Sequence, residues 1–284
     1  MSKVYEIVTE KILEALDKDI IPWKKSWDTP INKNPVSGTV YKGINVFLLN
    51  LSRIVNNYSS PYWYTFKQVS KNGGRIKKGE KSTLITFYNI KEKEKDLTEA
   101  EEKVFRDTGK LPKLFYLRYY LVFNHDQTEG LELPDKDKGK AFNSIACCEK
   151  VLRDYKDCPD IKYGFDPSYN KKDDIIRMPK KRDFENVEEY YSTIFHEMGH
   201  STGHKKRLKR VCLENYTGES YAKEELIAEM AAAFLCGHCS ISSSVIENQA
   251  AYVKGWKKKI KEDKYLVTHA AGAAQKAADY ILNV

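Results

Sequence analysis

The feature that most constrains this chain is the pentapeptide HEMGH at residues 196–200, in which two histidines are separated by three residues. On an α-helix, His196 and His200 lie one turn apart, so both imidazoles point the same way and can bind one metal ion. Glu197 lies beside the first imidazole, where its carboxylate can accept a proton from a metal-activated water. The spacing therefore predicts a helix at about 186–203 that carries a zinc hydrolase site with Glu197 as the catalytic base.

A catalytic zinc takes three protein ligands and a water, so a third ligand has to come from another segment. Residues 219–238 are predicted to be helical, and Glu225 and Glu229 lie four residues apart on a face otherwise made of Leu, Ile, Ala and Phe. Buried carboxylates on such a face need a compensating positive charge, which zinc and its histidines would supply. We assign Glu225 as a gluzincin-like third ligand and Glu229 as the acceptor of an imidazole N–H. The reverse assignment of the two glutamates stays open.

Three neighbouring features are expected to lie outside the metal site. Glu224 should face away from the histidines as a surface charge. His204 continues the helical register, but the helix should break at Gly203, so we favour a structural or substrate-side role over metal ligation. The sequence CGHC at 236–239 is a lone CxxC without a second pair, and it predicts a buried helix end rather than a second metal site.

The distribution of charge gives a second constraint. The chain of 284 residues has a net charge of +8, and residues 21–90 alone contain eleven Lys or Arg against two Asp or Glu. Such a concentrated basic segment indicates a polyanionic partner. Aromatic residues are interleaved with these cations, and rings that stack on bases beside cations that contact phosphates are typical of single-stranded DNA binding. The candidate DNA-binding residues are Trp23, Trp27, Lys42, Trp63, Lys67, Lys71, Arg75, Lys77, Lys78 and Lys81.

The length of the chain favours two domains. The polar segment 126–140 contains glycine and proline, so we place the linker there and expect domains at 1–130 and 131–284. The first domain should be small and α+β, and the charged stretch between its last two strands should be a solvated insertion with a short helix. Its predicted helices are 3–18, 44–56 and 67–72, and its predicted strands are 62–66, 82–90 and 115–124.

The second domain should be mainly helical with a small sheet, which places the whole chain in the α+β class. A strand pair is predicted near 162–164 and 174–178, where β-branched and aromatic residues gather. The predicted helices are 141–154, 186–203, 219–238, 245–262 and 268–282.

Nothing in the sequence points to export or to a membrane. The N-terminal residues 1–19 are charged and amphipathic rather than apolar, and no run approaches the roughly 18 apolar residues of a membrane span. The six cysteines all follow residue 146, and their spacing suggests no disulfide framework. We therefore expect a cytoplasmic protein without a membrane partner.

With both halves in view, the chain resembles the ArdC family of antirestriction proteins, relatives of which also form part of TraC-type plasmid primases. The resemblance extends over nearly the full length. It implies an N-terminal single-stranded-DNA-binding domain and a C-terminal zincin-like metallopeptidase domain. The segments that carry it are Pro22-Trp23 with Trp27, 41–45, 63–68, 78–81, 122–124 with 127–130, 174–179, 190–208, 221–234, 251–252 with Trp256, and 273–280.

The resemblance also implies a function. A protein of this kind is carried on a mobile element and protects incoming DNA from host restriction during conjugation, with single-stranded DNA as one partner. The peptidase substrate is unknown, and a component of the host restriction machinery is one candidate. Two alternatives stay open: a DNA-binding shield whose metal site is not proteolytic, and a regulatory protease that cleaves a repressor, as ImmA/IrrE-like proteins do.

Overall fold

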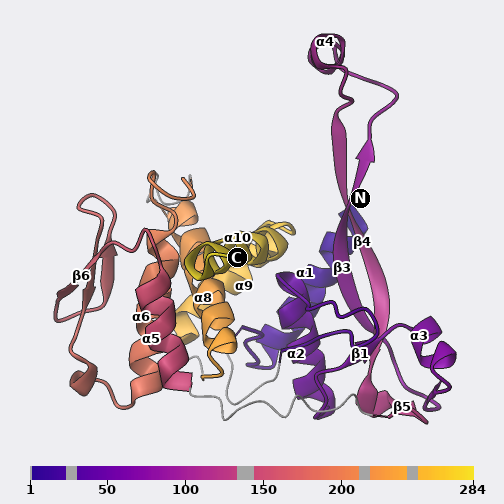
Figure 1. Cartoon of the computed structure of the whole chain (residues 1–284), viewed down its shortest axis with the longest axis horizontal. Helices are drawn as coiled ribbons and strands as arrows, with labels where there is room; N and C mark the ends of the chain where they lie inside the picture. The colour runs from indigo at the N-terminus through magenta and orange to yellow at the C-terminus, as the bar shows by residue number, and fades with distance from the viewer. Residues whose placement is uncertain (1, 24–30, 133–143, 211–217, 242–248) are drawn as a thin grey trace.

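The computed structural model describes five stretches of the chain, which are residues 2–23, 31–132, 144–210, 218–241 and 249–284. Both halves combine helices with short sheets, so the predicted α+β class is confirmed (Figure 1). No helix within these stretches is long and apolar enough to cross a membrane.

The N-terminal half is a small sheet with helices packed against it. Strand order is β1-β4-β3 in the main sheet, while β2 and β5 form a separate antiparallel pair. Helix α3 begins one residue before the predicted 67–72, because Thr65 and Gln68 form a capping box at its first turn. The elements are α1 (Ser2–Asp17), α2 (Ile44–Asn56), β1 (Trp63–Tyr64), α3 (Phe66–Lys71), β2 (Arg75–Ile76), β3 (Thr83–Glu92), α4 (Glu99–Thr108), β4 (Lys113–Asn124) and β5 (Thr128–Glu129).

Strands β3 and β4 form a long antiparallel hairpin that projects from the rest of the molecule (Figure 1). Their register runs from Thr83 opposite Val122 to Glu92 opposite Lys113. Both strands are predicted from the sequence and confirmed by the structure. The charged connection between them carries the expected short helix, α4, whose N-terminus is capped by the Thr98 side chain.

The C-terminal half is mainly helical with one small sheet. Strand β8 lies at the centre of this sheet, parallel to β6 and antiparallel to β7. The predicted strand pair is confirmed as β6 and β8, whereas the three-residue strand β7 was not predicted. The elements are α5 (Ser144–Asp154), β6 (Asp160–Tyr163), β7 (Ser168–Asn170), β8 (Ile175–Met178), α6 (Val187–Ser201), α8 (Gly218–His238), α9 (Gln249–Glu262) and α10 (Leu266–Leu282).

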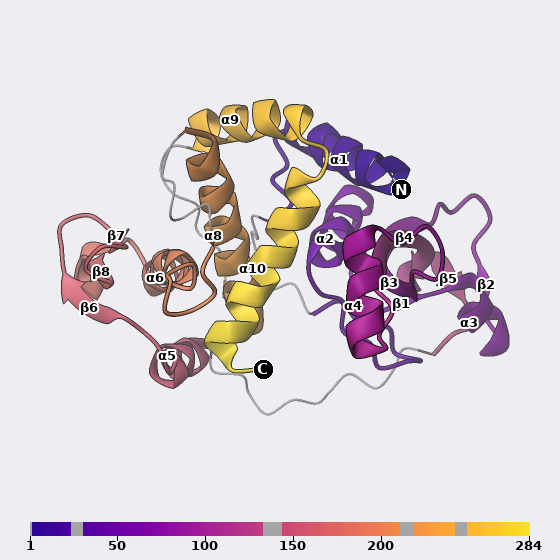
Figure 2. The ribbon, with the colours of Figure 1, turned by 90° about the horizontal axis from the view of Figure 1, so that it is seen from above.

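The two halves share a hydrophobic core. Helix α1 packs against α9, and α2 packs against α10 (Figure 2). Phe47 of α2 stacks on Phe234 of α8 with ring centroids 4.9 Å apart, and Trp23 meets Trp256 of α9 edge-on at 5.5 Å. The domain boundary near residue 130 stays a prediction, and most of the predicted linker lies outside the described residues. The hydrophobic core that the two halves share also includes Val8, Ile12, Leu16, Leu48, Leu84, Leu226, Met230, Ile260 and Ala274.

Because Phe47 is only 1% exposed at this junction, replacing it by alanine should destabilise the whole chain rather than one half. Removing a phenylalanine from a packed core costs about 3–5 kcal/mol of unfolding free energy. We expect guanidinium unfolding to give one transition with a lowered midpoint. Far-UV circular dichroism and tryptophan fluorescence should report the same shift.

The matched control is Phe66→Ala, because the Phe66 side chain on α3 is 61% exposed. A substitution at such a surface position should change stability by less than about 0.5 kcal/mol. Two separate transitions, only one of which shifts in the Phe47→Ala protein, would contradict a shared core.

Candidate metal centre and nucleic-acid surface

The two histidines of the HEMGH sequence are held by α6. The N-terminus of this helix is capped by Asn186, whose side chain accepts a hydrogen bond from the Glu189 N–H. Gly199 lets α6 approach α8 closely, because a Cβ at this position would lie 3.2 Å from the Cα of Ala228. The glycine within the motif therefore helps to bring the acidic side chains of α8 next to the imidazoles.

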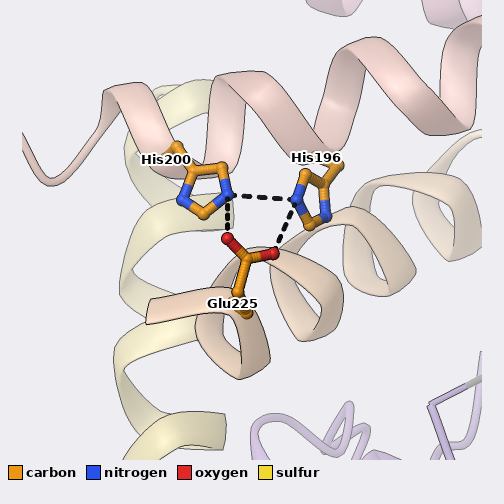
Figure 3. A group of neighbouring side chains, drawn as sticks. All are labelled: His196, His200 and Glu225. Carbon is orange, nitrogen blue, oxygen red and sulfur yellow. Dashed lines mark hydrogen bonds and ion pairs between the residues drawn. The ribbon is translucent and has the colours of Figure 1, made fainter. Parts of the chain in front are cut away.

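His196, His200 and Glu225 form the one group among the described residues whose side chains could hold a metal ion together (Figure 3). The Nε2 atoms of the two histidines lie 3.0 Å apart. The Glu225 carboxylate faces both imidazoles: its Oε2 atom lies 3.5 Å from the Nε2 atom of His196, and its Oε1 atom lies 3.5 Å from that of His200. Ligand atoms about 2.0–2.1 Å from a tetrahedral zinc are about 3.3 Å apart, so both the spacing and the donor types fit this metal.

The electrostatics of the group suit a cation. Burial opposes the charge on Glu225, but its interactions with the two imidazoles outweigh this effect and hold its pKa well below the usual range. Burial also works against a charged His200, yet contacts with Glu224 and Glu225 raise its pKa to about 10. Glu225 thus stays ionised in a buried place, where its charge needs a positive partner, and protonated imidazoles or a metal bound by neutral ones can supply it.

Two further glutamates lie close to this group. Glu197, the expected catalytic base, is buried at 6% exposure on α6. Glu229 lies one turn after Glu225, and its carboxylate approaches the Nδ1 atom of His196 at 3.7 Å. Among the residues that the structure describes, that nitrogen has no hydrogen-bond partner, and 3.7 Å is too long for a hydrogen bond. Burial raises the pKa of Glu229. Its position matches the one expected for an imidazole acceptor, and that role stays a proposal.

The expectation that Glu224 faces away as a surface charge is wrong. Its side chain is fully buried and contacts the Nδ1 atom of His200 at 3.4 Å. Arg210 donates to the same carboxylate at 3.0 Å and to the Gly199 carbonyl at 2.8 Å. Burial opposes ionisation of Glu224, but the contacts with His200 and Arg210 outweigh it and lower its pKa to about 2.

Glu224 is buried because other helices surround α8. The helix packs against α6 on one side and against α9 and α10 on others, so it has no solvent-facing side along much of its length. Residues 226–236 lack a polar face, and a helix that is apolar on all sides is typically buried. This pattern could have predicted the burial of α8.

His204 is not part of the metal group. Its Nδ1 atom accepts a hydrogen bond from the Lys206 N–H at 3.3 Å and lies 3.6 Å from Asp174. The sequence CGHC lies at the end of α8 as expected, and Cys236 and Cys239 are both buried.

The candidate stacking residues need correction. Trp63 is fully buried and donates from its indole nitrogen to the Asn32 side chain at 2.9 Å. Trp23 is 2% exposed and lies in the core between the two halves. Neither ring is accessible to a base in this structure, because each contributes to packing instead. Trp27 lies outside the described residues.

The candidate cations fall into two groups. Lys42 pairs with Asp279 of α10, and Arg75 pairs with Glu129 of β5. The remaining candidates form no ion pair with any residue that the structure describes. These exposed side chains are Lys67, Lys71, Lys77, Lys78 and Lys81.

Exposed aromatic rings occur instead on α3 and on the β3–β4 hairpin. They were not among the candidate DNA-binding residues. The signal in the sequence was the run FYLRYYLVFN at 115–124, which is apolar or aromatic on both faces of a strand. Rings with exposed fractions of 38–61% belong to Phe66, Phe87, Tyr88, Tyr119 and Tyr120.

Each half of the chain matches a known protein family. Residues 2–123 match the family described as the N-terminal domain of the anti-restriction factor ArdC. Residues 159–273 match the family described as zincin-like metallopeptidases, so the C-terminal half is a domain of that type, which implies a divalent metal.

Solved structures resemble the chain over nearly its whole length. Two crystal structures of the antirestriction ArdC protein from plasmid R388, one metal-free and one with Mn(II) bound, are 34% and 33% identical to it. Each match has a TM-score of 0.77 and covers 98% of this chain and 96% or 97% of the other. Two DNA primases TraC of Escherichia coli are 31% and 32% identical over 98% of this chain. The match covers only 20% and 27% of the primases' own length.

Proposed function

Because this chain belongs to the ArdC family of antirestriction proteins, we propose that it protects the incoming DNA of a mobile element from restriction by the host cell. In this proposal the N-terminal half binds single-stranded DNA and the C-terminal half works as a zinc metallopeptidase. The observation that carries it is the His196–His200–Glu225 group in a chain that matches an antirestriction protein over 98% of its length. The proposal concerns this chain alone and not the much longer TraC primases.

In the proposed centre, His196, His200 and Glu225 hold Zn²⁺ through two imidazole nitrogens and a carboxylate. Zinc bound there would polarise a peptide carbonyl and activate a water as a Lewis acid. Glu197 takes a proton from the attacking water as general base and gives it to the leaving amine as general acid. Glu224 fixes the orientation of the His200 ring through its contact with Nδ1.

For the N-terminal half, we propose that exposed lysines bind the phosphates of single-stranded DNA. Such contacts do not read bases, so binding should show little sequence preference and a strong dependence on salt. The DNA and a protein substrate from the host restriction machinery would both be met in the cytoplasm. The lysines concerned are Lys67, Lys71, Lys77, Lys78 and Lys81.

A second candidate function is a DNA-binding shield whose metal site is not proteolytic. It is favoured by the separation of the two surfaces. The exposed lysines belong to α3 and to the chain around β2, whereas the metal group lies on α6 and α8 at the opposite side of the molecule (Figures 1 and 2). A shield would need its DNA-binding surface for protection but would not need Glu197.

The double substitution Lys77→Glu and Lys78→Glu should weaken binding to oligothymidylate by about tenfold or more, because it replaces two phosphate-contacting charges by repelling ones. The loss of two contacts should also reduce the salt slope of log K by about 1.4. Fluorescence anisotropy at several salt concentrations measures both effects. In cells, transfer of unmodified DNA into a restricting host should be protected by the parent protein and less by this variant.

The matched control reverses two exposed lysines of the C-terminal half, Lys156→Glu and Lys162→Glu, and changes the net charge equally. Affinity should then fall much less. Equal losses in both variants would mean that net charge rather than a local surface governs binding. A parent protein that neither binds single strands nor raises the yield of transferred DNA would overturn the proposed function itself.

A further inference from the structure

The projecting β3–β4 hairpin presents one face that combines aromatic rings with cations. In an antiparallel pair, residues directly opposite each other point to the same side. The register places Phe87 opposite Arg118, Ile85 opposite Tyr120 and Asn89 opposite Tyr116. Lys91 and Leu114 follow as the next opposite pair on that side. We call the outer part of this side, made of Phe87, Asn89, Lys91, Leu114, Tyr116, Arg118 and Tyr120, the arm face.

Most of the arm face is exposed, and only Asn89 and Tyr116 are half-buried. Phe87 is 38% exposed and Tyr120 is 42% exposed, and both Arg118 and Lys91 are exposed as well. The other side of the hairpin differs, because Leu117 is buried there and the Tyr88 hydroxyl lies 3.5 Å from that of Tyr5 on α1. Tyr88 and Tyr119 on that other side are also exposed, at 53% and 50%, but there Tyr88 already contacts α1. On the arm face, Phe87 and Tyr120 are exposed beside Arg118.

The rings of the arm face are held in place by one another. Phe87 meets Tyr120 edge-on, with ring centroids 5.6 Å apart. The Arg118 guanidinium lies over the Tyr116 ring at 5.1 Å. Rings that are already positioned lose little conformational entropy when a flat ligand stacks on them. The arm face is therefore arranged for stacking before any ligand arrives.

The charge of the arm face selects the ligand. Its two charged side chains, Arg118 and Lys91, are both cationic, and the only acidic residue of the paired strands, Glu92, lies on the opposite side of the hairpin. Lys81 and Lys78 precede β3 and extend the positive charge to the foot of the hairpin. Exposed rings beside cations, without an acid, fit a polyanion that carries flat bases.

We propose that the arm face binds a single strand of DNA, with bases stacked on Phe87 and Tyr120 and with phosphates bound by Arg118 and Lys91. This inference rests on the proposed single-stranded-DNA binding and gives it a location. It replaces the buried tryptophans by exposed rings as the stacking residues, and it makes the hairpin a DNA-binding arm rather than a passive insertion.

The test is the double variant Phe87→Ala and Tyr120→Ala in the full chain. Each lost stack should lower the affinity for an oligothymidylate of about 30 nucleotides by about fivefold or more, so the double variant should bind about 25-fold more weakly or worse. The matched control is Phe165→Ala in the C-terminal half, where an 86% exposed ring is removed far along the chain from the hairpin. Its affinity should equal that of the parent. Unchanged thermal melting confirms that both variants are folded.

The outcomes separate this inference from the proposed function. If the parent protein does not bind oligothymidylate, the proposed function fails and the arm inference falls with it. If the parent binds and the Lys77→Glu, Lys78→Glu variant is weakened but the arm variant binds normally, only the arm inference is overturned. It is also overturned if the arm variant loses duplex binding alone. A third outcome would overturn it too. If light scattering shows that the parent protein is a dimer and the arm variant a monomer with unchanged DNA affinity, the arm face binds a second copy of the chain.

Discussion

Replacing Glu225 by alanine should abolish stoichiometric metal binding by the purified protein. Its carboxylate is the group that faces both imidazoles, with an oxygen 3.5 Å from each Nε2 atom. Without it, His196 and His200 are two ligands on one helix turn, and a catalytic zinc site takes three. We expect about one zinc per chain in the parent and almost none in Glu225→Ala after dialysis, as measured by inductively coupled plasma mass spectrometry.

Two neighbouring glutamates provide graded controls. Glu224→Gln should keep the metal but lower its affinity by about 10–100-fold, because the contact with the Nδ1 atom of His200 orients a ligand without touching the metal. Glu229→Gln should have an effect of the same order or smaller. If Glu229→Ala lost the metal and Glu225→Ala retained it, the reverse assignment of the two glutamates would be correct. Circular dichroism of each variant checks that the fold is intact.

The metal group could be predicted because its spacing is local. One helix turn fixes the relation between His196 and His200 whatever surrounds them, and the same rule placed Glu225 and Glu229 on one side of a second helix. Glu224 could not be placed in this way. Its position depends on α8 being enclosed by helices on several sides, and such enclosure is a property of the tertiary structure rather than of helical periodicity.

The roles of aromatic residues were harder to predict for a related reason. Trp63 and Phe87 both belong to the basic, aromatic segment, but one is fully buried and the other is 38% exposed. What separates them is which neighbours cover each strand, and composition carries no such information. The hairpin strands themselves were predicted, because β-branched and aromatic runs are typical of strands. Their projection from the body was not.

The shared core connects the proposed functions physically. Helix α8 carries Glu225, which faces α6, and it also carries Phe234, which stacks on Phe47 of α2. Helix α2 in turn holds β3 through Asn45, whose side chain bonds the backbone N–H and carbonyl of Thr86 at 2.7 Å each. The helix that supplies a metal ligand is thus packed, through one intermediate helix, against the strand that supplies the arm face. A change in the hairpin that moved α2 would have to repack α8 as well.

Replacing Glu197 by glutamine should separate hydrolysis from binding. Glutamine has nearly the same shape as glutamate but cannot accept a proton from water, and loss of a general acid–base group costs about 10²–10⁴-fold in rate. Metal content and affinity for oligothymidylate should stay at the parent level, because Glu197 is neither one of the three proposed metal ligands nor one of the proposed DNA-binding residues. Cleavage of a quenched fluorescent casein, measured with and without single-stranded DNA, should fall by the factor given above.

The same variant decides between the candidate functions in cells. If Glu197→Gln loses the protection of transferred unmodified DNA while the metal remains bound, hydrolysis is part of the protective function. If protection persists unchanged, the chain acts as a DNA-binding shield, and the Lys77→Glu, Lys78→Glu variant should then be the one that loses it. Labelling of new protein N-termini in parent and Glu197→Gln cells covers the remaining alternative. One specifically cleaved transcriptional repressor, together with protection that does not depend on DNA affinity, would instead identify a regulatory protease.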